Sequence, residues 1–274
     1  MSIPYKELYI YYVKGVVRTR DTQDLSDGFF IGNWQEEDSA FLFFTRPAQD
    51  RVAELVSRNP GLELVDSYSM SYSDWHGGEI RPFSAGRFYV APPWEYGEPK
   101  DGSIPVLLDP GVVFGAGTHP TTRSCLEAVE IACDMGGPDS AIDLGTGTGL
   151  LGLAAAGLGC RRVLAVDNNF LAVDTARRNI LNNRLDGRVL AVVADAGALV
   201  DCRADLLIAN IHFDVMRRLI ASPAFYEKKW FVLSGLLRSQ ARKVEELIYY
   251  GPGRILQRWI SEGVWYTFLG TCCV

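Results

Sequence analysis

From residue 105 onward, short apolar runs alternate with stretches of helical periodicity, and this alternation constrains the fold more than any other feature of the chain. The apolar runs predict strands at Ala141–Leu144, Arg162–Val166, Val189–Val193, Asp205–Ile208 and Trp230–Leu233. The stretches between them predict helices, among them Leu150–Leu158, Val173–Ile180 and Val215–Ile220. Strands and helices that alternate in this way form a parallel sheet with helices on both faces.

The end of the chain departs from this alternation. After a predicted helix at Ser239–Tyr249, the predicted strands Ile255–Ile260 and Val264–Leu269 are separated only by residues 261–263. A gap this short makes a hairpin, so these two strands are expected to be antiparallel. Seven strands that end in an antiparallel hairpin resemble the Rossmann-like α/β sheet of class I methyltransferases. An all-parallel dinucleotide dehydrogenase would not end this way.

The first part of the chain predicts a different architecture. Residues 1–68 are expected to form a small N-terminal α+β domain with strands at Leu8–Val13, Phe29–Trp34, Ala40–Thr45 and Leu62–Val65, and a helix at Pro47–Arg58. Residues 69–104 hold two tryptophans and four prolines without a clean period, which indicates an ordered connector. Residues 105–274 then form the sheet domain.

A glycine-rich segment, residues 143–149, follows the first strand of the predicted sheet and opens a helix. Gly145 and Gly147 allow the backbone to turn sharply and to approach a ligand closely. Asp167 ends the next strand, where a carboxylate can accept hydrogen bonds from the hydroxyls of an adenosine ribose. The glycine spacing is tighter than in the dinucleotide pattern, and Asp143 would repel a pyrophosphate, so the motif favours S-adenosyl-L-methionine. A structural turn without a ligand and a nicotinamide site are the two alternatives.

Three more polar residues follow the carboxyl ends of predicted strands, where open α/β sheets bind ligands. Asp195 can reach an adenine amino group, or it is a solvated loop carboxylate. Asn210 can orient an incoming amine with its side-chain oxygen, or it only forms a turn. His212 is a candidate general base because its ordinary pKa is near 6.5, or it simply lines the pocket.

A second glycine-rich loop, residues 109–119, runs into a helix that begins near Pro120. Thr121 and Thr122 present hydroxyl and amide groups at the start of this helix, where an anion or a carboxylate can dock. The loop precedes the first strand of the sheet, so it can fold over a cofactor as a lid.

Taken together, these segments resemble one family. LDPGVVFGAGTHPTTRSCL, IDLGTGTGLLGLAAAGLG, VLAVDNN, DLLIANI and LSGLL occur in the order and spacing of the bacterial ribosomal-protein methyltransferases called PrmA, and the resemblance covers about residues 70–274. It implies methylation of lysine ε-amines and an N-terminal α-amine on protein eleven of the large ribosomal subunit. It also implies S-adenosylmethionine contacts at Thr122, Gly145, Asp167 and Asn210, and lid residues at Phe114, Gly115, Thr118 and His119.

The chain departs from the family pattern in two places. After Ala-Asn-Ile the family continues with leucine and small residues, whereas this chain has His212-Phe213-Asp214, a change beside the expected acceptor. The family's first domain resembles a ferredoxin-like unit that docks the ribosomal protein. Residues 14–28 are too short and polar here for a good first helix.

Composition and charge exclude further classes of protein function. The net charge is −6, with 27 basic and 33 acidic residues, which argues against a nucleic-acid-coating protein. None of the six cysteines forms a CxxC pair, so no metal site is expected; buried thiols are expected at Cys272 and Cys273. The absence of an export signal and of an apolar run long enough to span a membrane predicts a cytoplasmic protein. Two alternatives to a ribosomal-protein methyltransferase stay open: a methyltransferase of another protein or small-molecule amine, and a non-catalytic binding module.

Overall fold

The computed structural model describes residues 3–25 and 28–272. By its internal contacts the chain divides into two units, the first comprising Met1–Ile80 with Asn169–Leu171 and the second Arg81–Asn168 with Ala172–Val274. Each unit has its own hydrophobic core. The N-terminal and sheet-domain boundaries expected from the sequence stay predictions.

The first unit is an antiparallel four-stranded sheet with one α-helix. Its elements are β1 (Glu7–Lys14), the 3-10 helix η1 (Thr19–Leu25), β2 (Phe30–Gln35), β3 (Ser39–Phe44), α1 (Gln49–Arg58), β4 (Glu63–Ser71) and the short α2 (Tyr72–Trp75). The strand order β2-β3-β1-β4 is that of a ferredoxin-like unit. As the polar sequence of residues 14–28 implied, a short 3-10 helix stands where the first α-helix of such a unit would lie.

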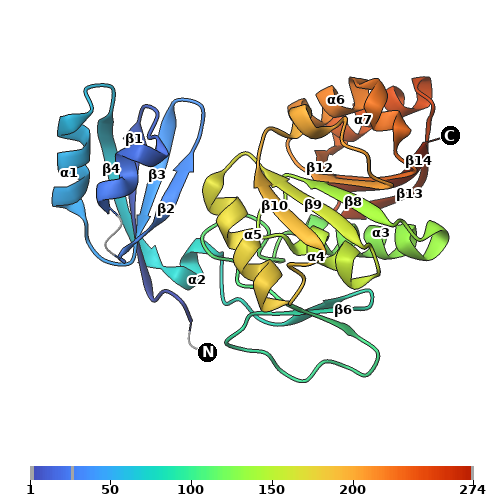
Figure 1. The fold of residues 1–274 in the computed structure, drawn as a ribbon, viewed down its shortest axis with the longest axis horizontal. Helices are drawn as coiled ribbons and strands as arrows, with labels where there is room; N and C mark the ends of the chain where they lie inside the picture. The colour runs from blue at the N-terminus through green and yellow to red at the C-terminus, as the bar shows by residue number, and fades with distance from the viewer. Residues whose placement is uncertain (1–2, 26–27, 273–274) are drawn as a thin grey trace. The chain divides into compact units, whose positions relative to one another are not determined.

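The second unit is built on a seven-stranded sheet with the order β10-β9-β8-β11-β12-β14-β13 (Figure 1). The strands are β8 (Ser140–Leu144), β9 (Arg162–Asp167), β10 (Val189–Val193), β11 (Leu206–Asn210), β12 (Trp230–Leu237), β13 (Gly253–Ser261) and β14 (Trp265–Cys272). The first five are parallel, and β14 is antiparallel to both of its neighbours. The class I methyltransferase-type sheet and its C-terminal hairpin are therefore confirmed.

Helices cover both faces of this sheet, as Figure 1 shows. The remaining elements of this part are α3 (Pro120–Gly136), α4 (Leu150–Gly157), α5 (Phe170–Asn182), η2 (Ala196–Leu199), α6 (Phe213–Ala221), η3 (Pro223–Glu227) and α7 (Arg238–Tyr250). In β8, Ala141 contributes to the core beneath α3, α4 and α5, whereas Ile142 contributes to the core beneath α6 and α7. Successive side chains along each strand thus point to opposite faces of the sheet and pack into two separate cores.

Residues 83–107, most of which were expected to be connector, form a second small sheet. Its strands β5 (Phe83–Ala85), β6 (Phe88–Ala91) and β7 (Ile104–Leu107) are too short to show a period in the sequence. Phe88 and Val106 belong to the same core as α3 and α4, so this sheet packs on that helical layer. The segment is therefore part of the second unit rather than a bare linker.

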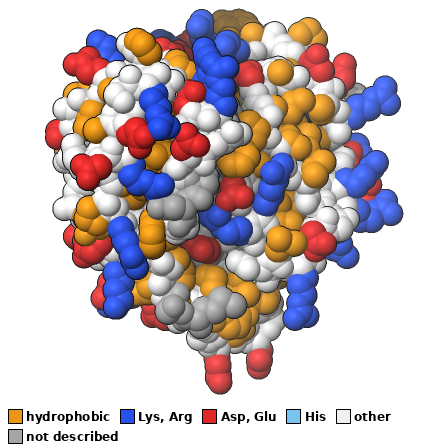
Figure 2. Space-filling view, turned by 60° about the vertical axis from the view of Figure 1, so that its left-hand side comes forward, with side chains coloured by type: hydrophobic (Ala, Val, Ile, Leu, Met, Phe, Trp, Pro, Cys, Tyr) orange, Lys and Arg blue, Asp and Glu red, His pale blue; other side chains and the backbone are white. Residues whose placement is uncertain are grey.

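Three further features of the described residues concern membrane-spanning helices, free cysteines and surface charge. Among the described residues, no helix is long and apolar enough to cross a membrane. Five cysteines in the described ranges are free, and Cys272 is buried; Cys273 lies outside those ranges. Figure 2 presents one face, on which Lys and Arg side chains are interspersed with Asp and Glu.

Candidate functional site

The glycine-rich loop between β8 and α4 needs its glycines for two reasons. Gly145, Gly147 and Gly149 have φ values of +75°, +53° and +88°, a region that other residues rarely adopt. A Cβ atom on Gly145 would lie 2.2 Å from Cγ2 of Ile211, and one on Gly147 would lie 2.5 Å from the carbonyl oxygen of Phe114. The loop is therefore in close contact with the end of β11 and with the segment that precedes α3.

Asp143 lies beneath this loop and is 1% exposed. Its Oδ2 accepts hydrogen bonds from Thr146 Oγ1 at 2.6 Å and from the Gly152 amide at 3.0 Å, so the carboxylate ties the loop to the first turn of α4. Burial raises the pKa of Asp143 to about 6, although these two hydrogen bonds act in the opposite direction. A direct contact between Asp143 and a cofactor stays a prediction.

The next two acidic residues lie at the ends of neighbouring strands. Asp167 ends β9, and its Oδ2 accepts a hydrogen bond from the Gly147 amide at 3.0 Å. The exposed Asp195 follows β10 and caps η2 by accepting hydrogen bonds from the amides of Gly197 and Ala198, at 2.8 and 3.2 Å. Asp167 thus contacts the glycine-rich loop directly, whereas Asp195 lies one strand further out, after β10.

The loop that precedes α3 is hydrogen-bonded to the glycine-rich loop. The Thr148 amide donates to the Phe114 carbonyl at 3.2 Å, and Thr148 Oγ1 donates to the Gly115 carbonyl at 2.8 Å. These bonds hold the backbone of residues 114–115 in place, while the Phe114 side chain is 77% exposed. Thr118 is also exposed. An aromatic ring on a fixed loop beside a glycine-rich turn is the arrangement expected of a lid residue.

A chain of polar groups connects the start of α3 to the end of β11. His119 is the N-cap of α3, and its Nδ1 accepts a hydrogen bond from the Thr121 amide at 3.3 Å. The same nitrogen lies 2.7 Å from Thr121 Oγ1, which in turn accepts from Asn210 Nδ2 at 3.2 Å. Thr122, in the same first turn, is 4% exposed, and its amide donates to the His119 carbonyl.

Trp265 of β14 contacts His119 from the other side, with the two ring centroids 4.8 Å apart in an edge-to-face arrangement. Partial burial lowers the pKa of His119 below its ordinary value, although the carboxylate of Glu262 acts in the opposite direction. The lowered pKa favours the neutral imidazole of His119. Because Nδ1 accepts from the Thr121 amide, the ring proton is expected on Nε2.

His212 is placed differently from the other histidine. It is the N-cap of α6 and makes no side-chain capping hydrogen bond, and its ring is exposed. Among residues 3–25 and 28–272, its side chain has no hydrogen-bond partner. His212 follows Asn210 by two residues, and its imidazole is open to solvent.

Most of the sequence-predicted residues come together at the carboxyl ends of β8, β9 and β11. Three further residues of this region have contacts that the linear sequence did not indicate. Thr121 was noted only as a polar group at a helix start, yet it connects His119 to Asn210. Gly235 has φ +82°, and a Cβ there would lie 3.0 Å from Asn210 Oδ1; the glycine within Leu-Ser-Gly-Leu-Leu was its only signal. For Trp265 the linear sequence gives no signal.

Comparisons with known proteins agree with this architecture. Residues 49–271 match the family model described as "Ribosomal protein L11 methyltransferase (PrmA)". The chain belongs to this family. It is therefore an enzyme that transfers methyl groups, and the family resemblance drawn from the sequence motifs is confirmed.

Among the described residues, no group of three or more His, Cys, Asp or Glu side chains is arranged to hold a metal ion.

Individual relatives give the extent of the similarity. The chain is 36% identical over 239 residues to a ribosomal protein L11 methyltransferase of Heliobacterium modesticaldum, covering 82% of this chain and 75% of that protein. It is 34% identical over 232 residues to the protein of the same name from Desulforamulus reducens, covering 81% and 74%. The crystal structure of a ribosomal protein L11 methylase from Lactobacillus delbrueckii subsp. bulgaricus superposes with a TM-score of 0.60 at 26% identity, covering 71% of this chain and all of that one.

Proposed function

We propose that this chain uses S-adenosyl-L-methionine to methylate amines of ribosomal protein L11, on lysine ε-amines and on the N-terminal α-amine. Family membership and the names of its relatives support the substrate. The observation that carries the proposal is the meeting of three segments at the carboxyl edge of the sheet: the loop at Phe114, the glycine-rich loop, and Asn210. A cytoplasmic location, with the ribosomal protein as partner, follows from this substrate.

The residues at this edge fit S-adenosylmethionine. Gly145 and Gly147 hold left-handed backbone conformations, and a Cβ atom on them would clash with Ile211 or with the Phe114 carbonyl, so only glycine allows the packing that shapes this edge. Asp167 ends β9, where a carboxylate binds ribose hydroxyls in this type of sheet. Asp195 is assigned to the adenine amino group. Phe114, Gly115, Thr118, His119 and Thr122 are assigned to the cover over the cofactor.

When bound, the cofactor supplies a methyl group on a sulfonium, which is already strongly activated. The task of the protein is therefore to place a neutral amine in line with that methyl group, and positioning accounts for most of the acceleration. A lysine amine has an ordinary pKa near 10.4 and must lose a proton first. Desolvation beside a cationic ligand lowers that pKa.

The polar chain at the start of α3 bears on which way the Asn210 amide points. Thr121 Oγ1 lies 2.7 Å from His119 Nδ1, 3.2 Å from Asn210 Nδ2 and 3.4 Å from Asn210 Oδ1. We assign the hydroxyl proton to the shortest of these contacts, His119 Nδ1, so that the oxygen accepts from Asn210 Nδ2. This assignment leaves Asn210 Oδ1 to accept an N–H of the substrate amine. His212, exposed and two residues after Asn210, is the group assigned to take up the released proton, with Asp214 as the other candidate.

The proposal is tested by methyl transfer from labelled S-adenosylmethionine into purified large-subunit ribosomal proteins and, separately, into a ribosome-depleted lysate. Asn210→Ala is run beside Asn182→Ala, which removes the same amide from the exposed end of α5. We expect label in protein L11 with the wild type and the Asn182 variant, and little with the Asn210 variant. Label confined to the ribosome-depleted fraction would assign a different acceptor. No label in either, with cofactor binding intact, would favour a small-molecule acceptor or a binding module.

A further inference from the structure

The parallel strands of the large sheet share a sequence feature at their amino ends. A basic residue immediately or closely precedes each of four strands: Arg161 for β9, Arg188 for β10, Arg203 for β11 and Lys229 for β12. Because the strands are parallel, these residues collect at one edge of the sheet, opposite the edge that holds Asn210 and the glycine-rich loop. The proposed function does not use this edge.

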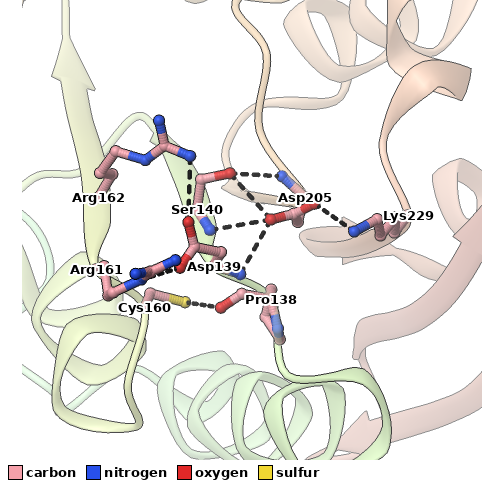
Figure 3. Close-up of polar contacts among 8 residues, drawn as sticks. All are labelled: Pro138, Asp139, Ser140, Cys160, Arg161, Arg162, Asp205 and Lys229. Atoms are coloured by element: carbon pink, nitrogen blue, oxygen red, sulfur yellow. Dashed lines mark hydrogen bonds and ion pairs between the residues drawn. The ribbon is translucent and has the colours of Figure 1, made fainter.

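Part of this charge is already neutralised, as Figure 3 shows. Asp139 pairs with Arg161 and, at 3.1 Å, with Arg162. Asp205 pairs with Lys229 at 2.7 Å, and its other oxygen accepts hydrogen bonds from Ser140 and from the Asp139 amide at 3.0–3.1 Å. These two carboxylates therefore have their own partners and do not draw on the remaining cations.

Two guanidinium groups at this edge have no such partner. Within the described ranges, no ion pair or side-chain hydrogen bond is made by Arg188 or by Arg203, and both side chains are exposed. Both line a cavity of about 900 Å³ at the amino ends of the strands. That volume is within the range of small-molecule sites, about 300–1,000 Å³.

The backbone that carries these two arginines is fixed. The Arg188 carbonyl accepts from the Val163 amide at 2.8 Å, which joins it to β9. Arg203 follows Cys202, whose carbonyl accepts from Lys228 Nζ at 2.7 Å. Lys228 is 1% exposed and also lines the cavity, so a buried ammonium group is committed to holding the segment that presents Arg203. Burying an ammonium group costs free energy unless it is hydrogen-bonded. The bond from Lys228 to Cys202 therefore holds this segment in a defined position.

The charge of the lining favours an anion. It includes five cations, Arg161, Arg162, Arg188, Arg203 and Lys228, and three anions, Asp186, Asp205 and Glu227. Guanidinium groups bind carboxylates and phosphates through paired hydrogen bonds. The guanidinium groups are exposed, so salt screens their charge. A ligand with a single charge therefore gains little binding free energy there. A group with several charges and several acceptor oxygens gains more.

We propose that the cavity at the amino edge of the large sheet binds a phosphorylated anion through Arg188 and Arg203. The site is separate from the methyl-transfer site, so a ligand there would bind without competing with the cofactor or the acceptor amine. The phosphate group can belong to a free small molecule or to the backbone of RNA, and the recognition chemistry at the two guanidinium groups is the same.

The test is calorimetric titration of the full chain with tripolyphosphate and, separately, with a short single-stranded RNA, at constant ionic strength. The cavity variant is Arg188→Gln with Arg203→Gln. The matched control is Arg217→Gln with Arg218→Gln, two exposed arginines of α6 that do not line the cavity. Circular dichroism and S-adenosylmethionine binding check that both variants are folded.

We expect the wild type and the control to bind tripolyphosphate alike, and the cavity variant to bind at least tenfold more weakly. Binding of RNA alone, weakened tenfold only in the cavity variant, would also support the site and assign the phosphate to nucleic acid. Equal weakening in both double variants would mean general attraction to surface charge and would overturn the proposal. Failure of the wild type to bind either probe would overturn it as well. None of these outcomes depends on the methyl acceptor.

Discussion

At the carboxyl edge of the large sheet, left-handed glycine turns and side chains hydrogen-bonded to nearby backbone surround the site, whereas at the amino edge arginine and lysine side chains pair with carboxylates. Gly145 and Gly147 hold left-handed conformations against neighbouring segments, and Thr121 connects His119 to Asn210. At the other edge, Asp139 and Asp205 pair with arginine and lysine. Close packing of protein segments at the carboxyl edge therefore requires backbone without side chains, whereas the amino edge carries paired charges.

The two edges also treat a carboxylate in opposite ways. Asp143 is buried beneath the glycine-rich loop, and burial raises its pKa. Burial acts in the same direction on Asp205, but its hydrogen bond with Lys229 and those from Ser140 and Asp139 outweigh it and lower the pKa. Substitutions at matched positions of the two edges therefore test this difference.

The largest effect is expected from Asn210→Ala. Removing a side chain that orients the reacting amine should lower kcat by about 10²–10³-fold, as for other preorganised polar groups. Asn182→Ala should leave kcat unchanged. Methyl-transfer kinetics with both variants measure this, and an Asn210 variant with wild-type kcat would remove that residue from the site.

Asp143→Asn should change how stability depends on pH. The folded-state pKa of about 6 exceeds the ordinary value of 3.8, so the wild-type contribution is fully present below about pH 4 and is lost as pH rises through 6. The difference in unfolding free energy, wild type minus variant, should fall by on the order of 3 kcal/mol across that interval. Denaturant unfolding at several pH values tests this, and a flat difference would contradict the assigned burial effect.

Asp205→Asn should show the opposite sign and a smaller size. Because the pKa of Asp205 is lowered, its contribution is present above the ordinary value and is lost as pH falls below it. With the Lys229 ammonium largely exposed, we expect about 1 kcal/mol at pH 7. The same unfolding series measures it, and a difference that grows as pH falls would exclude this pairing.

Thr121→Val is expected to have the smallest effect on catalysis. Loss of one neutral hydrogen bond to Asn210 should lower kcat about 3–10-fold with little change in KM. Thr271→Val at the amino edge, which removes a hydroxyl that donates to the Lys229 carbonyl, should leave kcat as it is. Equal kcat values in the two variants would show that Thr121 does not act on Asn210.

The sequence predicted the sheet well because each of its features is local. Alternating apolar runs, the glycine-rich turn and the three-residue gap before Val264 each lie within a few residues. It missed the sheet at residues 83–107, because strands of three or four residues show no period. The contact between Trp265 and His119 and the hydrogen bond between Asn210 and Thr121 join elements that are far apart in the chain. Such contacts are set by tertiary packing and are not visible in the local sequence pattern.

Binding of S-adenosylmethionine at the carboxyl edge of the large sheet is proposed to depend on a loop conformation that only glycine allows. The most direct test is calorimetric titration of this cofactor into Gly147→Ala and into Gly187→Ala, whose added methyl group meets open space at the amino edge. We predict that Gly187→Ala binds as the wild type does. Gly147→Ala should bind at least tenfold more weakly, since its Cβ would lie 2.5 Å from the Phe114 carbonyl and the φ of +53° costs about 1–3 kcal/mol. Wild-type affinity in Gly147→Ala would contradict the claim.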